Sequence, residues 1–269
     1  MIKEEKESWL RRARGKRKAF RDADDYEAHS PFWSEIKAVF MRLQKNKCIY
    51  CERKLEDETV GKIEWDLEHF RPKDAVKAWT HPEIDFPTSA GRDKGYHQLA
   101  YHPFNYLASC KPCNSALKAA YFPIEGPRAE ANARQPSVLE QEKPFFLYPL
   151  GTADTNPEEV LTYHGYLALP NAKSGFNHRR ARVSILCFGL NRDSLQLLRA
   201  KAIEHIWLAL RLVETGNAAD KRNARQTITR LLRDEEAHAG CIRAFHRLYL
   251  RDAKKAQSVY QFCAARLGG

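Results

Sequence analysis

The chain has 269 residues, of which 45 are Lys or Arg and 34 are Asp or Glu, so its formal net charge is +11. A chain of this length has room for one large domain or two small ones with a buried core. With 43% apolar residues and only 13 Gly and 13 Pro, the composition excludes a disordered or collagen-like chain. The positive charge fits a polyanionic partner such as nucleic acid.

The sequence shows neither a membrane span nor an export signal. Its longest strongly apolar stretch, residues 183–190, is far shorter than the roughly 20 residues that a membrane helix needs. The first 21 residues are densely charged and lack the apolar segment of a secretory signal. We therefore expect a cytoplasmic protein with no membrane partner.

Residues 1–29 are predicted to form a basic N-terminal helix or arm. Seven cations lie between positions 11 and 21, with no acidic residue among them. The arm either binds phosphate groups or presents a solvated helix face, and the sequence leaves both interpretations open. The candidate nucleic-acid contacts in this segment are Arg11, Arg12, Arg14, Lys16, Arg17 and Lys18.

The next elements lead to and from a predicted strand. A helix is expected over 30–43, because Ser and Pro at its start favour helix initiation and apolar residues follow at helical spacing. Residues 62–70 alternate apolar and acidic side chains, which is the period of a half-buried strand. Residues 72–95 predict a surface excursion with one short helix, and 96–107 returns to the core.

The second half of the chain is predicted to be mainly helical. Residues 123–144 have the composition of a linker, and short strands are expected over 145–148 and 161–169, the latter interrupted at Gly165. Helices are expected from Asn191 onward and over about 219–237 and 240–266.

Four of the seven cysteines form two C-x-x-C pairs, Cys48 with Cys51 and Cys110 with Cys113. Disulfides are disfavoured in a reducing compartment, so paired knuckles of this kind predict a four-thiolate zinc site. We expect these four residues to hold a structural Zn²⁺, and the other three cysteines to be ordinary buried thiols.

Residues with oxygen and nitrogen ligands lie between the two pairs and directly after them. Glu68 and His69 end the predicted strand, Asn105 precedes the second pair, and Asn114 follows it. A carboxylate and an amide oxygen suit Mg²⁺ or Mn²⁺, whereas thiolates prefer zinc. Two metal sites are thus possible, zinc for the fold and a hard cation for chemistry, with Asp66 as an auxiliary ligand of the second.

This order of residues resembles the HNH endonuclease family, whose zinc-stapled members carry C-x-x-C, an acid-His step, an Asn, and a second C-x-x-C followed by Asn. Longer segments are similar to the nuclease subunits of Septu-type and retron-associated anti-phage systems. Those segments are Leu-Glu-His-Phe-Arg-Pro-Lys at 67–73, Asn-Tyr-Leu-Ala-Ser-Cys-Lys-Pro-Cys-Asn at 105–114, Phe-Pro at 122–123 and Phe-Gly-Leu-Asn-Arg-Asp-Ser-Leu at 188–195.

The resemblance implies an α+β fold. Its first part would be a ββα-metal HNH nuclease unit with a four-cysteine zinc site over 30–125. A mainly helical C-terminal region would follow over 126–269 and contact a partner or nucleic acid.

The resemblance also implies a role for each matching residue. His69 would be the general base, Asn105 would orient it, and Lys118 would approach the phosphate. Glu68 and Asn114 would hold Mg²⁺ or Mn²⁺. Two positions depart from the family: Glu68 stands where many members have Asp, and Ala119 stands where Gly often follows, so the helix could continue past Lys118. Arg71 and Lys73, just beyond the strand, are further candidates for phosphate contact.

The implied activity is metal-dependent hydrolysis of phosphodiester bonds, with DNA favoured over RNA and an ATPase subunit as partner. Two alternatives remain open. One is an RNase toxin that cleaves tRNA with the same residues, because none of them evidently reads the 2′-hydroxyl group. The other is a zinc-ribbon module that binds nucleic acid or protein without cleavage. The basic faces of the C-terminal region fit either nucleic acid or a partner protein.

Overall fold

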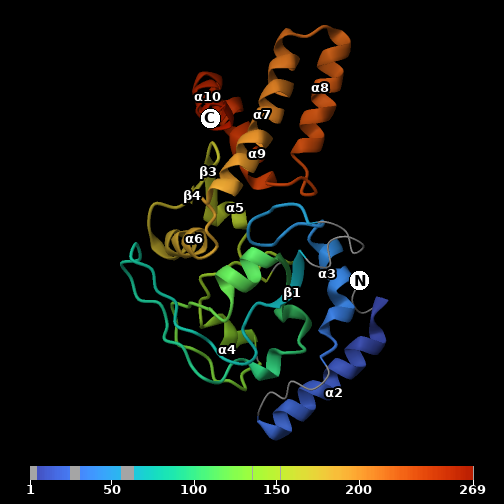
Figure 1. Cartoon of the computed structure of the whole chain (residues 1–269), viewed down its shortest axis with the longest axis vertical. Coiled ribbons are helices and arrows are strands. Elements are labelled where there is room, and N and C mark those ends of the chain that lie inside the picture. The colour runs from blue at the N-terminus through green and yellow to red at the C-terminus, as the bar shows by residue number, and fades with distance from the viewer. Residues whose placement is uncertain (1–4, 25–30, 56–63, 135, 152, 269) are drawn as a thin grey trace. The chain divides into compact units, whose positions relative to one another are not determined.

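The computed structural model describes residues 5–24, 31–55, 64–134, 136–151 and 153–268 (Figure 1). The chain divides into two compact units. The first comprises Met1–Tyr50 and Leu55–Thr155, and the second comprises Cys51–Lys54 and Asn156–Gly269. Helices and two small antiparallel sheets are both present, so the mixed α and β content agrees with the predicted class.

The first unit is built around one two-stranded sheet and short helices. Its elements are α2 (Glu7–Ala23), η1 (Trp33–Ile36), α3 (Lys37–Leu43), β1 (Trp65–His69), η3 (His97–Leu99), η4 (Pro103–Asn105), β2 (Tyr106–Cys110), η5 (Pro112–Lys118) and α4 (Pro136–Glu140). Among these, η1, η3 and η4 are 3₁₀ helices, and η5 is a π-helical stretch.

Strands β1 and β2 pair antiparallel, with Trp65 opposite Cys110 and His69 opposite Tyr106. Because successive side chains of a strand point to opposite faces, His69 lies on one face of this sheet and Glu68 on the other. The two residues at the centre of the predicted site therefore lie in different surroundings.

An aromatic layer covers the face that carries His69. The Trp9 ring of α2 and the Phe40 ring of α3 meet Tyr106 edge-on, with centroids 6.1 and 5.8 Å apart. The Trp33 ring of η1 meets His69 in the same way at 5.1 Å. Trp9 is almost fully buried, which explains why the charged N-terminal segment folds onto the unit as a helix.

The outer edge of β2 is covered by side chains. The Gln44 amide donates to the Ala108 carbonyl at 2.7 Å and accepts from the Ala108 N–H at 2.8 Å. The Ile49 N–H also donates to the Ala108 carbonyl, and the Tyr148 hydroxyl donates to the Tyr106 carbonyl. These bonds satisfy peptide groups of β2 that point away from β1.

Three expectations for the first unit need correction. The helix expected over 30–43 begins at Trp33 with a 3₁₀ turn, and its predicted cap, Ser30, lies outside the described residues. The strand covers Trp65–His69, and residues 62 and 63 also lie outside the described part. The regular alternation fails at Glu68, which is only 3% exposed, because η5 covers that face.

Two further elements were predicted wrongly. No helix forms over 72–95, all of which the structure describes; an isolated bridge between Val76 and Arg92 closes this excursion instead. Residues 145–148 are buried but form no strand. An isolated bridge joins Ile124 to Pro144, and this pairing does not extend into 145–148. An apolar run signals burial, and a strand needs a partner as well.

Helix η5 ends at Lys118 and does not continue. The next residue, Ala119, has φ 44° and ψ −124°, and its N–H bonds to the Asn114 carbonyl. A residue with a Cβ is strained in this region of backbone space, whereas glycine is not. The expectation of a longer helix is therefore wrong, although the sequence has Ala at the turn.

Replacing Ala119 by Gly is expected to stabilise the chain by about 1 kcal/mol, because it relieves backbone strain that exceeds the added entropy of the unfolded state. Urea denaturation measures the change. The matched control is Ala120→Gly, whose φ is not positive and which should be neutral or destabilising. A loss of stability in Ala119→Gly would contradict the strain argument.

The second unit packs helices on a β-hairpin. Its elements are α5 (Pro157–Val160), β3 (Leu161–His164), β4 (Leu167–Pro170), α6 (Gly175–Cys187), α7 (Asp193–Thr215), α8 (Ala218–Leu231), α9 (Ala239–Arg251) and α10 (Ala253–Gly268). The hairpin turns at Gly165, where φ is +56°, and this is the residue at which the strand predicted over 161–169 was interrupted. Helices α7 and α8 form a hairpin of their own (Figure 1).

Two features of this unit were not predicted. Helix α6 lacks a clear apolar period, and the helix expected over 240–266 is divided at Asp252 into α9 and α10.

Ile203 and Trp207 of α7 pack with Ile242 and Phe245 of α9 in the core. Among the described helices, none is long and apolar enough to span a membrane.

Candidate metal centre and catalytic site

The four paired cysteines come together. The sulfur atoms of Cys48, Cys51, Cys110 and Cys113 all lie within 4.8 Å of one another, and each residue is buried and outside any disulfide. A tetrahedral zinc ion with Zn–S bonds of about 2.3 Å places its ligands roughly 3.8 Å apart. The donor set therefore fits a metal ion such as zinc, which would join the end of β2 to the start of η5.

His69 is the last residue of β1 and is half-buried. Its Nε2 lies 3.0 Å from the Ala100 carbonyl oxygen, while its ring contacts Trp33 and Tyr106. Because a carbonyl oxygen only accepts hydrogen bonds, Nε2 must carry the proton of the neutral ring. Nδ1 is then the nitrogen that is able to accept a proton.

The surroundings of His69 keep its imidazole uncharged. Burial lowers the pKa of His69 to about 3; the bond to Ala100 opposes this shift, and the charges of Lys73 and Lys118 add to it. At neutral pH the ring is therefore a neutral group with one fixed donor and one available acceptor.

The Asn105 side chain makes no hydrogen bond to the His69 ring. Its amide oxygen accepts from the Arg71 N–H at 2.8 Å, and its nitrogen donates to the carbonyls of Arg71 and Leu99 at 3.0 and 3.2 Å. Asn105 thus ties the backbone after His69 to the backbone before Ala100. The side chain that was expected to orient the ring acts on the peptide segments that do so.

Glu68 is held on the opposite face of β1. Its two carboxylate oxygens are bound by the Tyr50 hydroxyl and, at 3.0 Å, by Lys118 Nζ. Burial raises the pKa of Glu68, and both partners oppose that rise. Lys118, only 1% exposed, also donates to the His69 carbonyl at 2.9 Å. The lysine expected at the phosphate is therefore part of a buried ion pair.

Asn114 is paired with a different carboxylate. Its amide nitrogen lies 3.1 Å from Asp66 Oδ2, which also receives Lys111 Nζ at 3.0 Å. Glu68 belongs to β1 and Asn114 to η5, which covers the same face of the sheet. Their side chains nevertheless have separate partners. Both carboxylate oxygens of Glu68 and the amide nitrogen of Asn114 are thus bound by protein groups.

The two cations after β1 have different surroundings. The Arg71 guanidinium is mostly buried, bonds Glu142 at 2.8 Å and lies against the rings of Tyr96 and Phe122. Lys73 pairs with the neighbouring Asp74, and its Nζ lies 5.4 Å from the centre of the Trp33 ring. Of the two residues predicted to contact phosphate, Lys73 therefore lies near His69, whereas Arg71 lies in the core.

The basic residues of α2 also divide into groups. Arg12 pairs with Glu35, while Arg11 and Lys16 line neither of the two cavities beside α2, of about 300 and 410 Å³. Three others line a pocket that also contains residues absent from the sequence-based site. The pocket residues found only from the structure are Arg21, Gln98, His102 and Arg134. Only Arg21 has a signal in the sequence, because it continues the helical spacing of the cations before it.

No family model and no solved structure matches the chain. The chain is similar to a curated protein, Septu protein PtuB of Bacillus mycoides (strain KBAB4), with 30% identity over 174 residues. The matched part covers 64% of this chain and 52% of that protein, so the chain spans about half the length of this relative. The fold and the site described above thus accompany a resemblance to a Septu protein.

Proposed function

We propose that the chain is an HNH endonuclease that hydrolyses phosphodiester bonds in nucleic acid, DNA in preference to RNA. The similarity to Septu protein PtuB supports a role in anti-phage defence, as the nuclease subunit of a complex with an ATPase. The observation that carries the activity is His69, a neutral imidazole with Nε2 fixed on Ala100 and Nδ1 left to accept a proton.

The proposed reaction uses His69 as general base. Nδ1 takes a proton from the water that attacks the phosphorus, and the bond to Ala100 holds the ring in the required tautomer. A bound phosphate brings negative charge, which raises the pKa of His69 toward the range where it accepts a proton readily. Lys73 lies near enough to lower the pKa of His69 and would stabilise the charge of the transition state.

Mg²⁺ or Mn²⁺ is the predicted catalytic cofactor, and zinc is the predicted structural one. A hard cation would stabilise the leaving oxygen as a Lewis acid. Because Tyr50 and Lys118 bind both carboxylate oxygens of Glu68, protein groups alone carry the two proposed steps, proton uptake by His69 and charge stabilisation by Lys73. The metal requirement is tested by comparing cleavage with and without each cation in the same assay.

Replacing His69 by Ala is expected to reduce cleavage by about 10²–10⁴-fold, the usual contribution of a general base. The assay uses the complex with its ATPase subunit, Mg²⁺ or Mn²⁺, and duplex DNA, single-stranded DNA and tRNA as substrates. The matched control is His164→Ala, an exposed histidine of the second unit. Equal cleavage by wild type and His69→Ala would refute the assignment, and selective cleavage of tRNA would favour the RNase alternative.

A non-cleaving zinc module is the second candidate. The observation that favours it is the buried pair of Glu68 with Lys118, which occupies the carboxylate expected to bind a catalytic cation. This candidate predicts that the complex binds nucleic acid but cleaves none of the three substrates. It also predicts that His69→Ala leaves binding unchanged.

A further inference from the structure

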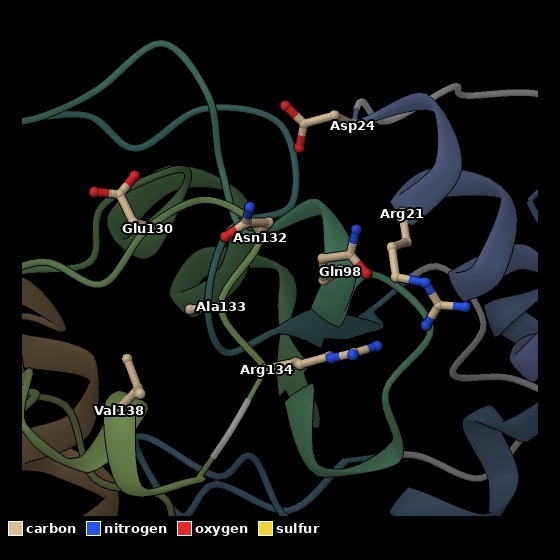
Figure 2. Close-up of a pocket in the computed structure, with 8 residues that line it drawn as sticks. All are labelled: Arg21, Asp24, Gln98, Glu130, Asn132, Ala133, Arg134 and Val138. Atoms are coloured by element: carbon tan, nitrogen blue, oxygen red, sulfur yellow. The ribbon is translucent and has the colours of Figure 1, made fainter.

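The first unit contains a basic pocket of about 300 Å³, and none of its lining residues is acidic. The residues that line it are Arg14, Arg17, Lys18, Arg21, Gln98, His102 and Arg134. A neighbouring cavity of about 410 Å³ shares Arg21, Gln98 and Arg134 (Figure 2). We call the first of these two cavities the basic pocket.

One face of α2 supplies four of the cations. Arg17, Lys18 and Arg21 follow Arg14 by three, four and seven positions, the spacing of residues on the same side of a helix. Burial, followed by the charges of Arg14 and of Arg134, lowers the pKa of Arg17. Lys18 pairs with Asp22 at 2.6 Å, and Arg21 lies 3.9 Å from the same carboxylate. One carboxylate cannot balance the five cations that line the pocket, so an anion would be stabilised among them.

Two residues that line the basic pocket carry buried donor atoms without a protein partner among the described residues. Gln98 is 4% exposed, and its amide nitrogen has no hydrogen-bond partner among the described residues; the same is true of Arg17 Nε. Figure 2 shows Gln98, Arg21 and Arg134 in the neighbouring cavity, and the same three residues also line the basic pocket. A buried donor left unpaired costs about 1–3 kcal/mol, which the oxygen atoms of a ligand would recover.

His102 adds a further donor. Its Nδ1 accepts from the Phe104 N–H at 3.3 Å, and burial lowers the pKa of His102 to about 4. The neutral ring must therefore carry its proton on Nε2, which donates. The charged groups, the Gln98 amide nitrogen and His102 together suit an anion with several oxygen atoms.

An exposed aromatic ring lies beside the pocket. Phe104 is 74% exposed, the highest value among the exposed large hydrophobic residues of the described chain, and its ring centroid lies 5.7 Å from that of His102. A solvated ring of this size next to anion donors is typical of sites where a nucleobase stacks and its phosphate is bound.

We propose that the basic pocket binds a phosphate group of single-stranded nucleic acid and that Phe104 stacks on the adjoining base. The inference deepens the proposed function and rests on it for the choice of nucleic acid. Residues 98–102 connect the pocket to the catalytic candidate, because the Ala100 carbonyl between Gln98 and His102 holds His69 Nε2. The pocket would thus bind the strand at a phosphate group other than the one that is cleaved.

Binding is measured on the full chain carrying His69→Ala, so that the strand stays intact whether or not the wild type cleaves it. The probe is a fluorescein-labelled oligothymidine, followed by anisotropy over a series of salt concentrations. Arg134→Gln is expected to weaken binding about ten- to a hundredfold and to reduce its salt dependence. Phe104→Ala is expected to weaken it by about five- to a hundredfold with the salt dependence unchanged.

Matched controls use exposed residues outside the pocket. Lys254→Gln removes an exposed cation and Leu250→Ala an exposed apolar side chain, and neither should alter the affinity. Phe104→Ala should leave the affinity for duplex DNA unchanged, because the bases of a duplex are already stacked. Since Phe104 is exposed, its replacement tests the proposal without disturbing the core.

Unchanged affinity in both Arg134→Gln and Phe104→Ala, or no binding of the oligonucleotide at all, would overturn the proposal. A second result would also overturn the proposal: ATP displaces a fluorescent ATP analogue from the protein, and the variants bind the oligonucleotide as tightly as before. This result would assign the pocket to free nucleotides. Pocket-dependent binding, together with no cleavage by the wild-type complex with its ATPase subunit and Mg²⁺ or Mn²⁺, would instead refute the proposed function and leave the subsite standing.

Discussion

Replacing Lys118 by Met while Glu68 is retained will lower the free energy of unfolding of the first unit by about 3–5 kcal/mol. The two side chains are 1% and 2% exposed, and their charged atoms lie 3.0 Å apart. The substitution leaves a carboxylate buried without its cation, bound only by Tyr50. Tryptophan fluorescence during urea denaturation measures the loss, because four of the five tryptophans lie in this unit.

The double variant Glu68→Gln with Lys118→Met should recover most of this loss, because no charge is then left buried without a partner. The matched control is Arg211→Gln, which breaks an exposed pair with Glu214 and should change stability by less than about 1 kcal/mol. If Lys118→Met were as mild as Arg211→Gln, the buried pair would not stabilise this unit.

Removing the metal from the cysteine cluster will have the largest effect on folding. Structural zinc sites contribute on the order of 10 kcal/mol, and the four thiols here tie β2, η5 and the turn after α3 together. Cys110→Ser, or a strong chelator, should release about one zinc ion per chain and unfold the first unit. Zinc release is measured with a colorimetric indicator, in parallel with tryptophan fluorescence.

Cys187→Ser is the matched control, since Cys187 is also a buried cysteine and lies in α6, outside the cluster. It should keep the zinc ion and leave the fluorescence of the first unit unchanged. A chain that contains no metal when purified, and that stays folded in the chelator, would contradict a structural role for the four cysteines.

The cysteine cluster was accessible from the sequence because its chemistry is local. Two residues between paired cysteines set each half of the site, and thiolates prefer zinc whatever the surrounding fold. The interruption of the strand at Gly165 was accessible for a similar reason, since a positive φ at a turn selects glycine, although the hairpin itself was not predicted. Both predictions depend on a few neighbouring residues.

The arrangement around β1 was not accessible in this way. Alternation along a strand tells which residues share a face, but not which face a later segment will cover. Helix η5 returns Lys118 to Glu68 and Asn114 to Asp66, and these partners are about 50 positions away in the sequence. Tertiary packing therefore decides whether the carboxylate of Glu68 meets a lysine or a metal ion.

The basic pocket shows the same limit more strongly. Arg134 comes from a segment with the composition of a linker, and Gln98 and His102 have no pattern that marks them as binding residues. Only the folded chain brings them to the cations of α2. The sequence indicated that the N-terminal segment is basic, and the structure adds the groups that would give it selectivity.

The Gln44 side chain has a consequence for how the molecule behaves in solution. A two-stranded sheet has an open edge on each side, and unpaired peptide groups there invite a strand from another molecule. By bonding both the N–H and the carbonyl of Ala108, one amide side chain occupies the middle of that edge. Gln44 therefore hinders a strand of another molecule from pairing with this edge of β2.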